Sequence, residues 1–275
     1  MKSKNILIYY QSLRSYILFR DILIREPELF DTVIKMPAIP YSRKTAKRNF
    51  LKYIRSAIQS PQYFLIQFLT IYVYSIFSKL FNNSIESICR KNKINHFYHE
   101  RFDTKLVKLI TMIRPTFIVN NSSSLLPLEM LGIATNGVIN FHEAPLPAYR
   151  GSAAYFWILV NGDSVSYSTC HFVEEELDSG DIICIGDTVN VMESQSVFDF
   201  WRKMLFSHKK NWNYLIPFLS NNVKPESYKQ DTYGINNYSY PSKEAINIIR
   251  NKKINFINFS DLYFIFKAAV NGTLE

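Results

Sequence analysis

The sequence predicts an α/β protein with a mostly parallel sheet, because short apolar runs alternate with amphipathic segments of helical spacing. Residues 14–24 and 104–113 carry apolar side chains on one helical face. This alternation is typical of βαβ units, whose ligands bind at the carboxyl ends of the parallel strands. Buried strands are expected at residues 6–10, 32–36, 94–98, 116–120 and 138–141.

The pattern changes in the second half of the chain. Residues 166–173 and 181–191 alternate or run apolar, and the turn residues Asp178-Ser179-Gly180 lie between them, so two further strands are expected. We expect one large domain over residues 1–190 and a small, mainly helical region over residues 191–275. The other expected elements are helices at 152–160, 197–219, 243–251 and 261–269, and a polar, turn-rich stretch at 221–240.

The composition and net charge of the chain limit which partners and which cellular compartment are expected. The 275 residues include 32 Lys and Arg against 23 Asp and Glu, a net charge of +9 that favours phosphates, nucleic acid or an acidic membrane surface. Cys89, Cys170 and Cys184 are odd in number and lack CxxC spacing, so neither a disulfide scaffold nor a metal site is expected. No secretory leader is recognisable, so a cytoplasmic location is expected.

A helical insertion is expected at about residues 41–90, between the second and third strands. It contains a basic run at 43–55 and an uncharged, largely apolar stretch at 56–78. The favoured interpretation is a long helix that is mostly buried. The alternative is a helix within residues 56–81 that lies on the inner face of a membrane, with basic residues near anionic lipid. A homodimer through apolar C-terminal segments is a further expectation.

The residues that indicate chemistry follow the expected strand at 138–141. Asn140 and His142 are two residues apart, so both project from the same side of that strand at its carboxyl end. An amide N–H and a protonated imidazole there would both donate to an oxyanion formed when an amine attacks an acyl carbon. The carboxylate of Asp178 would favour the charged imidazole and accept the proton that the amine loses. This scheme needs no protein nucleophile.

The motifs in this region resemble those of the folate-dependent formyltransferases. The resemblance covers about residues 115–190 and implies the family's Rossmann-like fold, with residues 1–190 as the formyltransferase catalytic domain. It also implies N10-formyltetrahydrofolate as donor, and an amine as acceptor. The matching residues, in order, are Asn140-Phe141-His142, Leu146-Pro147-x-Tyr149-Arg150-Gly151, Trp157-(x)4-Gly162, Thr169-Cys170-His171 and Asp178-Ser179-Gly180-Asp181-Ile182.

The same resemblance assigns roles to individual residues. Asn140, His142 and Asp178 match the family's catalytic residues, and His171 matches a histidine that we interpret as structural support. The remaining matches are the pterin-binding segment Ser124, Leu125 and Leu126 together with the Asp178 loop, and the substrate-side loop of Pro147, Tyr149, Arg150 and Gly151.

Three departures from the family pattern bear on the acceptor. Ser123-Ser124 replaces a common Tyr-Gly, Pro145 stands where Leu is commoner, and the stretch at 56–81 is additional. Sugar-modifying members often share the proline. The spacing after residue 190 predicts helices, whereas the C-terminal barrel of tRNA formyltransferases needs several strands. We therefore expect a nucleotide-linked amino sugar as acceptor, in surface-polysaccharide synthesis, and nucleic acid is not favoured. The alternatives are a methionyl-tRNA formyltransferase and a non-catalytic member that binds folate or a membrane.

Overall fold

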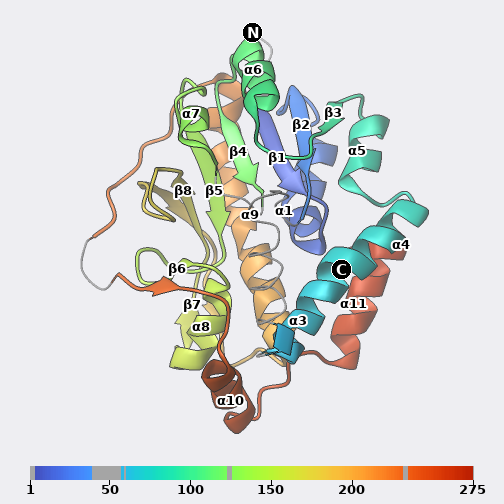
Figure 1. Ribbon diagram of the computed structural model, residues 1–275, viewed down its shortest axis with the longest axis vertical. Coiled ribbons are helices and arrows are strands. Elements are labelled where there is room, and N and C mark those ends of the chain that lie inside the picture. The colour runs from blue at the N-terminus through green and yellow to red at the C-terminus, as the bar shows by residue number, and fades with distance from the viewer. Residues whose placement is uncertain (1–3, 39–56, 59, 123–125, 232–234, 275) are drawn as a thin grey trace.

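The computed structural model describes residues 4–38, 57–58, 60–122, 126–231 and 235–274. It confirms the expected α/β architecture, which is built on a seven-stranded sheet of order β3-β2-β1-β4-β5-β8-β9 (Figure 1). Strands β1 to β5 are parallel, whereas β8 and β9 are antiparallel additions at one edge. The sheet consists of β1 (Ile6–Tyr10), β2 (Thr32–Met36), β3 (Asn95–Tyr98), β4 (Ile118–Asn121), β5 (Val138–His142), β8 (Thr169–Phe172) and β9 (Ile182–Ile185).

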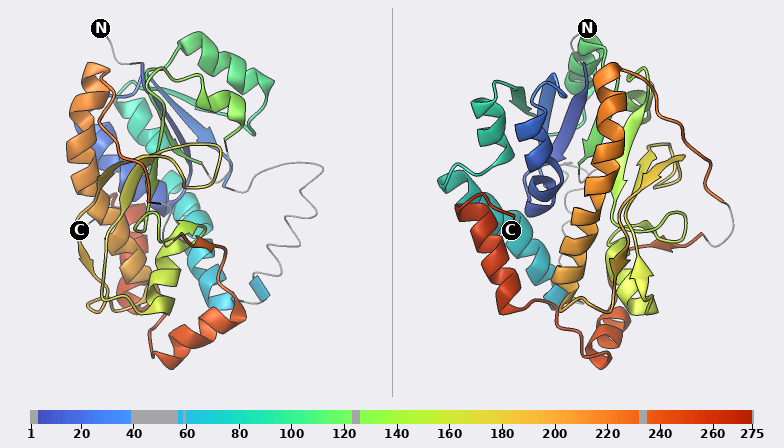
Figure 2. Two further views of the ribbon diagram at one scale, coloured as in Figure 1. Left: turned by 90° about the vertical axis from the view of Figure 1, so that its left-hand side faces the viewer. Right: turned by 180° about the vertical axis from the view of Figure 1, so that it is seen from behind.

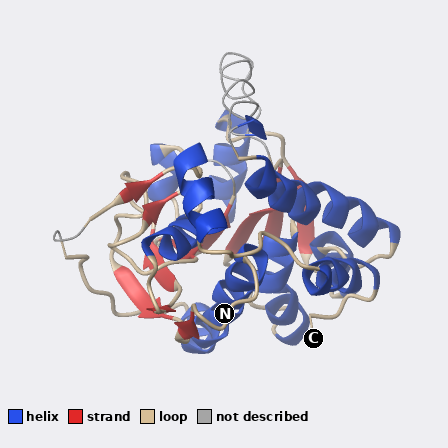
Figure 3. Ribbon diagram, turned by 90° about the horizontal axis from the view of Figure 1, so that it is seen from below, coloured by secondary structure: helices blue, strands red, loops and turns tan. Residues whose placement is uncertain are grey.

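Helices cover both faces of the sheet, as the alternate side chains of β1 require. Leu7 and Tyr9 of β1 share a core with α1 (Leu13–Arg25), α5 (Ile85–Lys91) and α9 (Val197–Asn221). Ile6 and Ile8 share a second core with α6 (Thr104–Ile113) and α7 (Leu128–Leu131). Figures 2 and 3 show helices on both sides of the sheet, and Figure 2 shows the long helix α9 lying along it. Both faces of β1 are buried, which is why its sequence is continuously apolar.

The region after residue 190 shares its core with the strands that precede it. Helix α9 begins at an N-cap, Ser196, whose hydroxyl accepts from the amide of Asp199 and donates to Asp261 of α11 (Phe259–Val270). Trp212 of α9 packs on Phe19 and Phe141, so the helix joins α1 to β5. Helix α10 (Lys243–Asn251) contacts α8 (Ala154–Asn161). The expected mainly helical C-terminal region is present, and it packs against the sheet rather than forming a core of its own.

Each of the two long strands expected after residue 165 is divided in the structure. The first run forms β7 (Val165–Ser166) and β8, and the second forms β9 and β10 (Val189–Asn190), with β7 and β10 paired antiparallel. The division of the second run coincides with Gly186, where a Cβ atom would lie 2.2 Å from Ser168 Oγ and 2.6 Å from the carbonyl oxygen of Ser207. Close approach to α9 therefore bends the chain there, an effect that apolar alternation does not reveal.

The expectation that the apolar insertion is mostly buried is wrong. It forms α3 (Pro61–Phe68), the π-helical turn η1 (Leu69–Val73) and α4 (Tyr74–Leu80), and only 22% of its most apolar window is buried. Tyr63 and Tyr74 face inward, whereas Ile76 and Leu80 are exposed. By length and composition alone, the segment Pro61–Lys91 is long and apolar enough to cross a membrane. The basic run at 43–55 lies outside the described residues.

Candidate active site

The predicted catalytic residues meet at the edge where β5 ends. Strand β5 carries Asn140 and His142 two residues apart, and in the antiparallel pairing with β8 Asn140 lies opposite His171. Asp178 lies in the turn between β8 and β9. Strand alternation and the β5–β8 pairing thus bring Asn140, His142 and His171 together, and the turn between β8 and β9 adds Asp178.

The Asp178 carboxylate lies between the two imidazoles. Its Oδ2 is 3.6 Å from His142 Nδ1, and its Oδ1 is 3.6 Å from His171 Nε2. The side chains of His142, Asp178 and His171 are 8%, 9% and 1% exposed, respectively. Asn140 Nδ2 lies 3.2 Å from His171 Nε2. A buried carboxylate among imidazoles and an amide interacts with them more strongly than it would in water.

His171 orients the amide of Asn140. The pKa of His171 is lowered to about 4, mainly by burial and in part by the nearby His142, against the opposing effect of Asp178. The ring is therefore neutral at pH 7. Its Nδ1 lies 2.6 Å from the carbonyl oxygen of Phe172, so Nδ1 carries the proton and Nε2 accepts from Asn140. One N–H of Asn140 is thus used, and the other is left for a ligand.

The hydrogen bonds of His142 define which of its nitrogens is used. Its Nε2 lies 2.6 Å from the carbonyl oxygen of Tyr149, which can only accept, so Nε2 donates. Nδ1 then faces Asp178. In the neutral ring Nδ1 is an acceptor, and it becomes a donor only when the imidazole is protonated. The charged form expected from the sequence is therefore the form that can donate to an oxyanion.

The turn that holds Asp178 has an unusual backbone. Asp178 has φ of 51°, in the left-handed region that few residues other than glycine adopt. Its Oδ2 accepts a 2.8 Å hydrogen bond from the amide of Gly151. At Gly180, two residues on, a Cβ atom would lie 2.1 Å from the carbonyl oxygen of Phe172, so only glycine fits. Tertiary contacts therefore hold this turn in place.

The predicted substrate-side loop lies against a segment that comes after α9. Arg150 and Gly151 form β6, which pairs in parallel with β11 (Asn237–Tyr238). The ring of Tyr238 stacks between those of Tyr149 and Trp157, with centroids 5.4 and 5.1 Å away. The Tyr149 hydroxyl donates to Asp163 at 2.6 Å. The remaining loop residue, Pro147, follows a cis peptide bond.

The predicted pterin-binding segment is only partly described. Ser124 and Leu125 lie outside the described residues, so their prediction stays a prediction. Leu126 is half-buried and packs against the core formed with α6 and α7.

Two polar features of the site were not predicted. Arg14 at the start of α1 forms an ion pair with Glu143 and donates to the carbonyl oxygen of Phe141 at 2.8 Å, so it supports the end of β5. Gln230 contacts both the Asp178 turn and Arg150. Glu143 directly follows Asn140-Phe141-His142, so its position beside the site could have been predicted from the motif. Arg14 and Gln230 are far from the motif in sequence, and no periodicity marks them.

Comparison with known proteins agrees with this geometry. Residues 78–213, about half of the chain, match the family model "Formyl transferase". The chain carries a formyl transferase domain. The resemblance inferred from the motifs is thereby confirmed, and β5, β8 and the Asp178 turn all lie within the matched region.

Relatives of this formyl transferase domain differ in what they act on. A methionyl-tRNA formyltransferase of Thermodesulfovibrio yellowstonii is 38% identical over 82 residues, which are 30% of this chain and 27% of that protein. A GDP-perosamine N-formyltransferase of Brucella melitensis is 32% identical over 82 residues, 30% of this chain and 31% of that one. The chain thus matches about a third or less of the length of these two relatives.

Among solved structures, the N-formyltransferase of Helicobacter canadensis shares the fold. It has a TM-score of 0.56 and 14% identity, with 93% of this chain and 84% of that chain covered.

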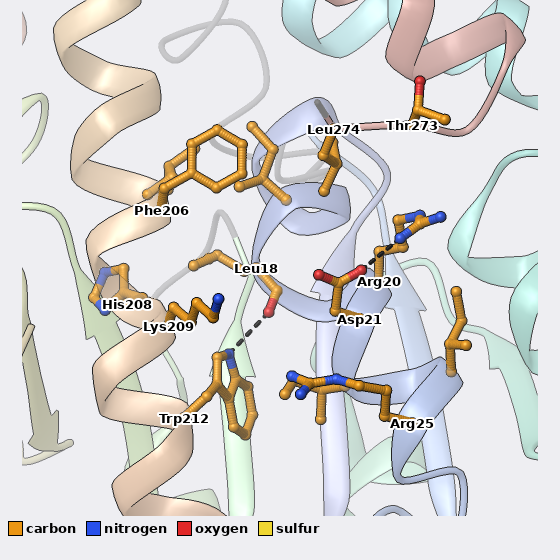
Figure 4. A pocket seen from close by; sticks show the side chains of 14 residues that line it. Leu18, Arg20, Asp21, Arg25, Phe206, His208, Lys209, Trp212, Thr273 and Leu274 are labelled. Carbon is orange, nitrogen blue, oxygen red and sulfur yellow. Dashed lines mark hydrogen bonds and ion pairs between the residues drawn. The ribbon is translucent and has the colours of Figure 1, made fainter.

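A groove elsewhere on the molecule is separate from the predicted catalytic residues. It has a volume of about 660 Å³ and lies between α1 and α9, beside Thr273 and Leu274 (Figure 4). Trp212 and the backbone of Leu18, joined by a 2.8 Å hydrogen bond, lie at its wall. None of Asn140, His142 and Asp178 lines it.

We expect the free energy of unfolding of this protein to decrease as the pH falls from about 6.5 to 4. His171 is neutral in the folded protein, with its pKa lowered to about 4, whereas in the unfolded chain it protonates near its ordinary value of 6.5. The unfolded chain therefore binds more protons in this window, which costs the fold about 3 kcal/mol by pH 4. Burial lowers the pKa of His208 in the same direction.

Urea unfolding at pH 7 and at pH 5 measures this effect. The His171→Gln variant keeps a side-chain acceptor for Asn140 but cannot titrate, so its stability should depend less on pH than that of the wild type. Equal pH dependence of the two proteins would contradict the assignment of a buried neutral imidazole.

Proposed function

We propose that this protein transfers a formyl group from N10-formyltetrahydrofolate to the amine of a nucleotide-linked amino sugar. The observation that carries the proposal is the cluster of Asn140, His142 and Asp178 at the carboxyl end of β5. These three residues supply an amide donor, an imidazole and a carboxylate, which are the groups that acyl transfer to an amine requires.

The donor set of the site fits a formyl donor of this kind. The unused N–H of Asn140 and the Nδ1 of His142 both lie at the carboxyl end of a parallel strand, where ligands of such sheets bind. The backbone around Leu126 and the Asp178 turn, together with the Ser124-Leu125 segment, would hold the pterin. When bound, N10-formyltetrahydrofolate supplies the electrophilic formyl carbon.

The residues of this chain then have separate tasks. Asn140 donates the N–H that His171 leaves free to the developing oxyanion. Protonated His142 donates from Nδ1, because its Nε2 is engaged by Tyr149. The Asp178 carboxylate stabilises the charged imidazole and takes up the proton that the attacking amine loses. It would return that proton to N10 of tetrahydrofolate as the bond between N10 and the formyl carbon breaks, which balances the transfer. The low exposure of these side chains strengthens each interaction by excluding water.

The choice of acceptor rests on the wall beside the site. Tyr149, Trp157 and Tyr238 form a stack of three aromatic rings there, a surface suited to contact with a sugar ring or a base. The net charge of +9 suits a diphosphate. The Helicobacter canadensis structure is a complex with folinic acid and dTDP-3-aminofucose, which supports the same class of donor and acceptor for this fold.

An acceptor panel tests the proposal. The purified protein is incubated with N10-formyltetrahydrofolate and with dTDP-, UDP- and GDP-linked amino sugars, and initiator methionyl-tRNA is tested in parallel. Mass spectrometry of the acceptors then reports formylation. We expect one sugar nucleotide to gain a formyl group. Methionyl-tRNA is the second candidate acceptor, because a methionyl-tRNA formyltransferase is 38% identical over 82 residues. If methionyl-tRNA alone were formylated, it would take the place of the amino sugar as the proposed acceptor. Donor binding without transfer to any acceptor would favour a non-catalytic role.

We further propose that the protein acts in the cytoplasm and contacts an anionic lipid surface through its insertion. Phe77 of α4 contacts Phe266 of α11, so the exposed sides of the two helices adjoin. Lys79 is the only charged residue between positions 61 and 80, so no acidic group opposes anionic lipid there. The exposed apolar side chains of this face are Leu65, Phe68, Ile76, Phe77, Leu80, Leu262, Tyr263 and Phe266.

Vesicle co-sedimentation tests the lipid contact. Ile76 and Leu80 are 65% and 70% exposed, so the double change Ile76→Glu and Leu80→Glu should abolish binding to vesicles that contain phosphatidylglycerol. Met112→Glu is the matched control, because Met112 is 81% exposed on α6. Absence of binding by the wild type would overturn the lipid contact. A dimer in light scattering that the double variant disperses would assign the face to a second copy of the chain.

A further inference from the structure

The segment that follows α9 returns to the active site from outside the region matched by the family model. Tyr228 exchanges backbone hydrogen bonds of 2.9 and 3.0 Å with Ile182 of β9. Further along, β11 pairs with β6. Gln230, two residues beyond Tyr228, therefore lies between the Asp178 turn and the substrate-side loop.

The side chain of Gln230 makes four hydrogen bonds there. Its Nε2 donates to the carbonyl oxygens of Asp178 and Gly180, both at 2.8 Å. Its Oε1 accepts from Nε and Nη2 of Arg150, at 3.0 and 2.7 Å. Both amide protons and the amide oxygen are thus used. Arg150 is itself buried, and the amide of the next residue, Gly151, donates to Asp178 Oδ2.

We propose that Gln230 is a positioning residue that fixes the Asp178 carboxylate between His142 and His171. Asp178 has a left-handed backbone, and its turn is held by hydrogen bonds from Gln230 and from the Gly151 amide. Gln230 binds the carbonyl of Asp178 itself, and through Arg150 it holds the strand that supplies the Gly151 donor. It binds the turn at the backbone and contacts neither imidazole.

The expected fall in kcat rests on the proposed function, whereas the expected position of the Asp178 carboxylate does not. Gln230→Met keeps the length of the side chain and removes all four hydrogen bonds. We expect kcat for formyl transfer to fall about 10- to 100-fold, because a small displacement of a catalytic group has an effect of this size. KM for the acceptor should change less than about threefold, since acceptor contacts remain.

A second readout requires no turnover. In histidine-labelled protein, the imidazole ¹⁵N resonances of His142 and His171 should move in Gln230→Met toward their positions in Asp178→Asn. Lys229→Met is the matched control, because Lys229 is the exposed neighbour in the same segment, and it should leave these resonances and kcat unchanged. Gln230→Glu keeps an acceptor for Arg150 but places a carboxylate oxygen against the carbonyl oxygens of Asp178 and Gly180. Its kcat should therefore fall as that of Gln230→Met does.

The two readouts separate this inference from the proposed function. Unmoved imidazole resonances in folded Gln230→Met, or a Gln230→Glu variant with wild-type kcat, would overturn the positioning role. A wild type without formyl transfer, but with resonances that move as expected, would overturn the proposed reaction and leave the positioning role intact.

Discussion

His142→Asn is expected to lower kcat for formyl transfer by about 10³-fold or more, with donor binding retained. The variant loses the imidazole that, when protonated, has its Nδ1 left to donate to an oxyanion, and electrostatic and proton-transfer contributions of this kind are each worth about 10²–10³-fold. The His142 side chain is 8% exposed, and its Nε2 donates to the carbonyl oxygen of Tyr149. Asparagine is smaller and uncharged, so it fits this space without introducing a charge. Single-turnover kinetics with excess enzyme measure the chemical step directly.

The control for this variant is His99→Asn. His99 lies outside the site, where it contacts Asp103 at the start of α6. It should leave the single-turnover rate at the wild-type value. A rate for His142→Asn within about threefold of the wild type would remove His142 from the catalytic machinery.

Asp178→Asn is expected to lower kcat by about 10²–10⁴-fold, the usual contribution of a positioned acid–base group. The change keeps an oxygen that can accept from the Gly151 amide, so the turn should remain folded. It removes the negative charge 3.6 Å from both His142 and His171, and with it the proton acceptor of the reaction. The measurement is kcat across a pH series, with circular dichroism as a check of folding.

Asp187→Asn is the matched carboxylate control, because Asp187 is exposed beyond β9. It should behave as the wild type over the whole pH series. If Asp178→Asn followed the wild-type profile too, the coupling between Asp178 and His142 would be absent.

Most of the fold could be predicted from local pattern. Strands β1 and β2 and helices α6 and α10 have the bounds expected from apolar runs and helical spacing, because each packs apolar side chains into a core. The insertion could not be predicted in this way. Its apolar sequence suits a buried helix and an exposed apolar face equally, and only the packing of Tyr63, Tyr74 and α11 shows which side faces inward.

In the candidate active site, too, some residues could be predicted from local pattern and others could not. Asn140 and His142 could be predicted because strand alternation and one short motif place them together, and Asp178 because its turn belongs to the same series of motifs. The orienting role of His171 depends on its pairing across β5 and β8 and on a tautomer that the sequence does not encode. Arg14 and Gln230 reach the site from α1 and from beyond α9, so no local pattern relates them to it.

The most direct test of the central claim follows a labelled formyl group. N10-formyltetrahydrofolate labelled with ¹³C at the formyl carbon is incubated with the acceptor panel and with wild type or His142→Asn. We expect the label to appear as an amide on an amino sugar nucleotide with the wild type, and His142→Asn to transfer it less than a hundredth as fast. Equal transfer by the two proteins would contradict the assigned site, and no transfer by the wild type to any amine would contradict the assigned reaction.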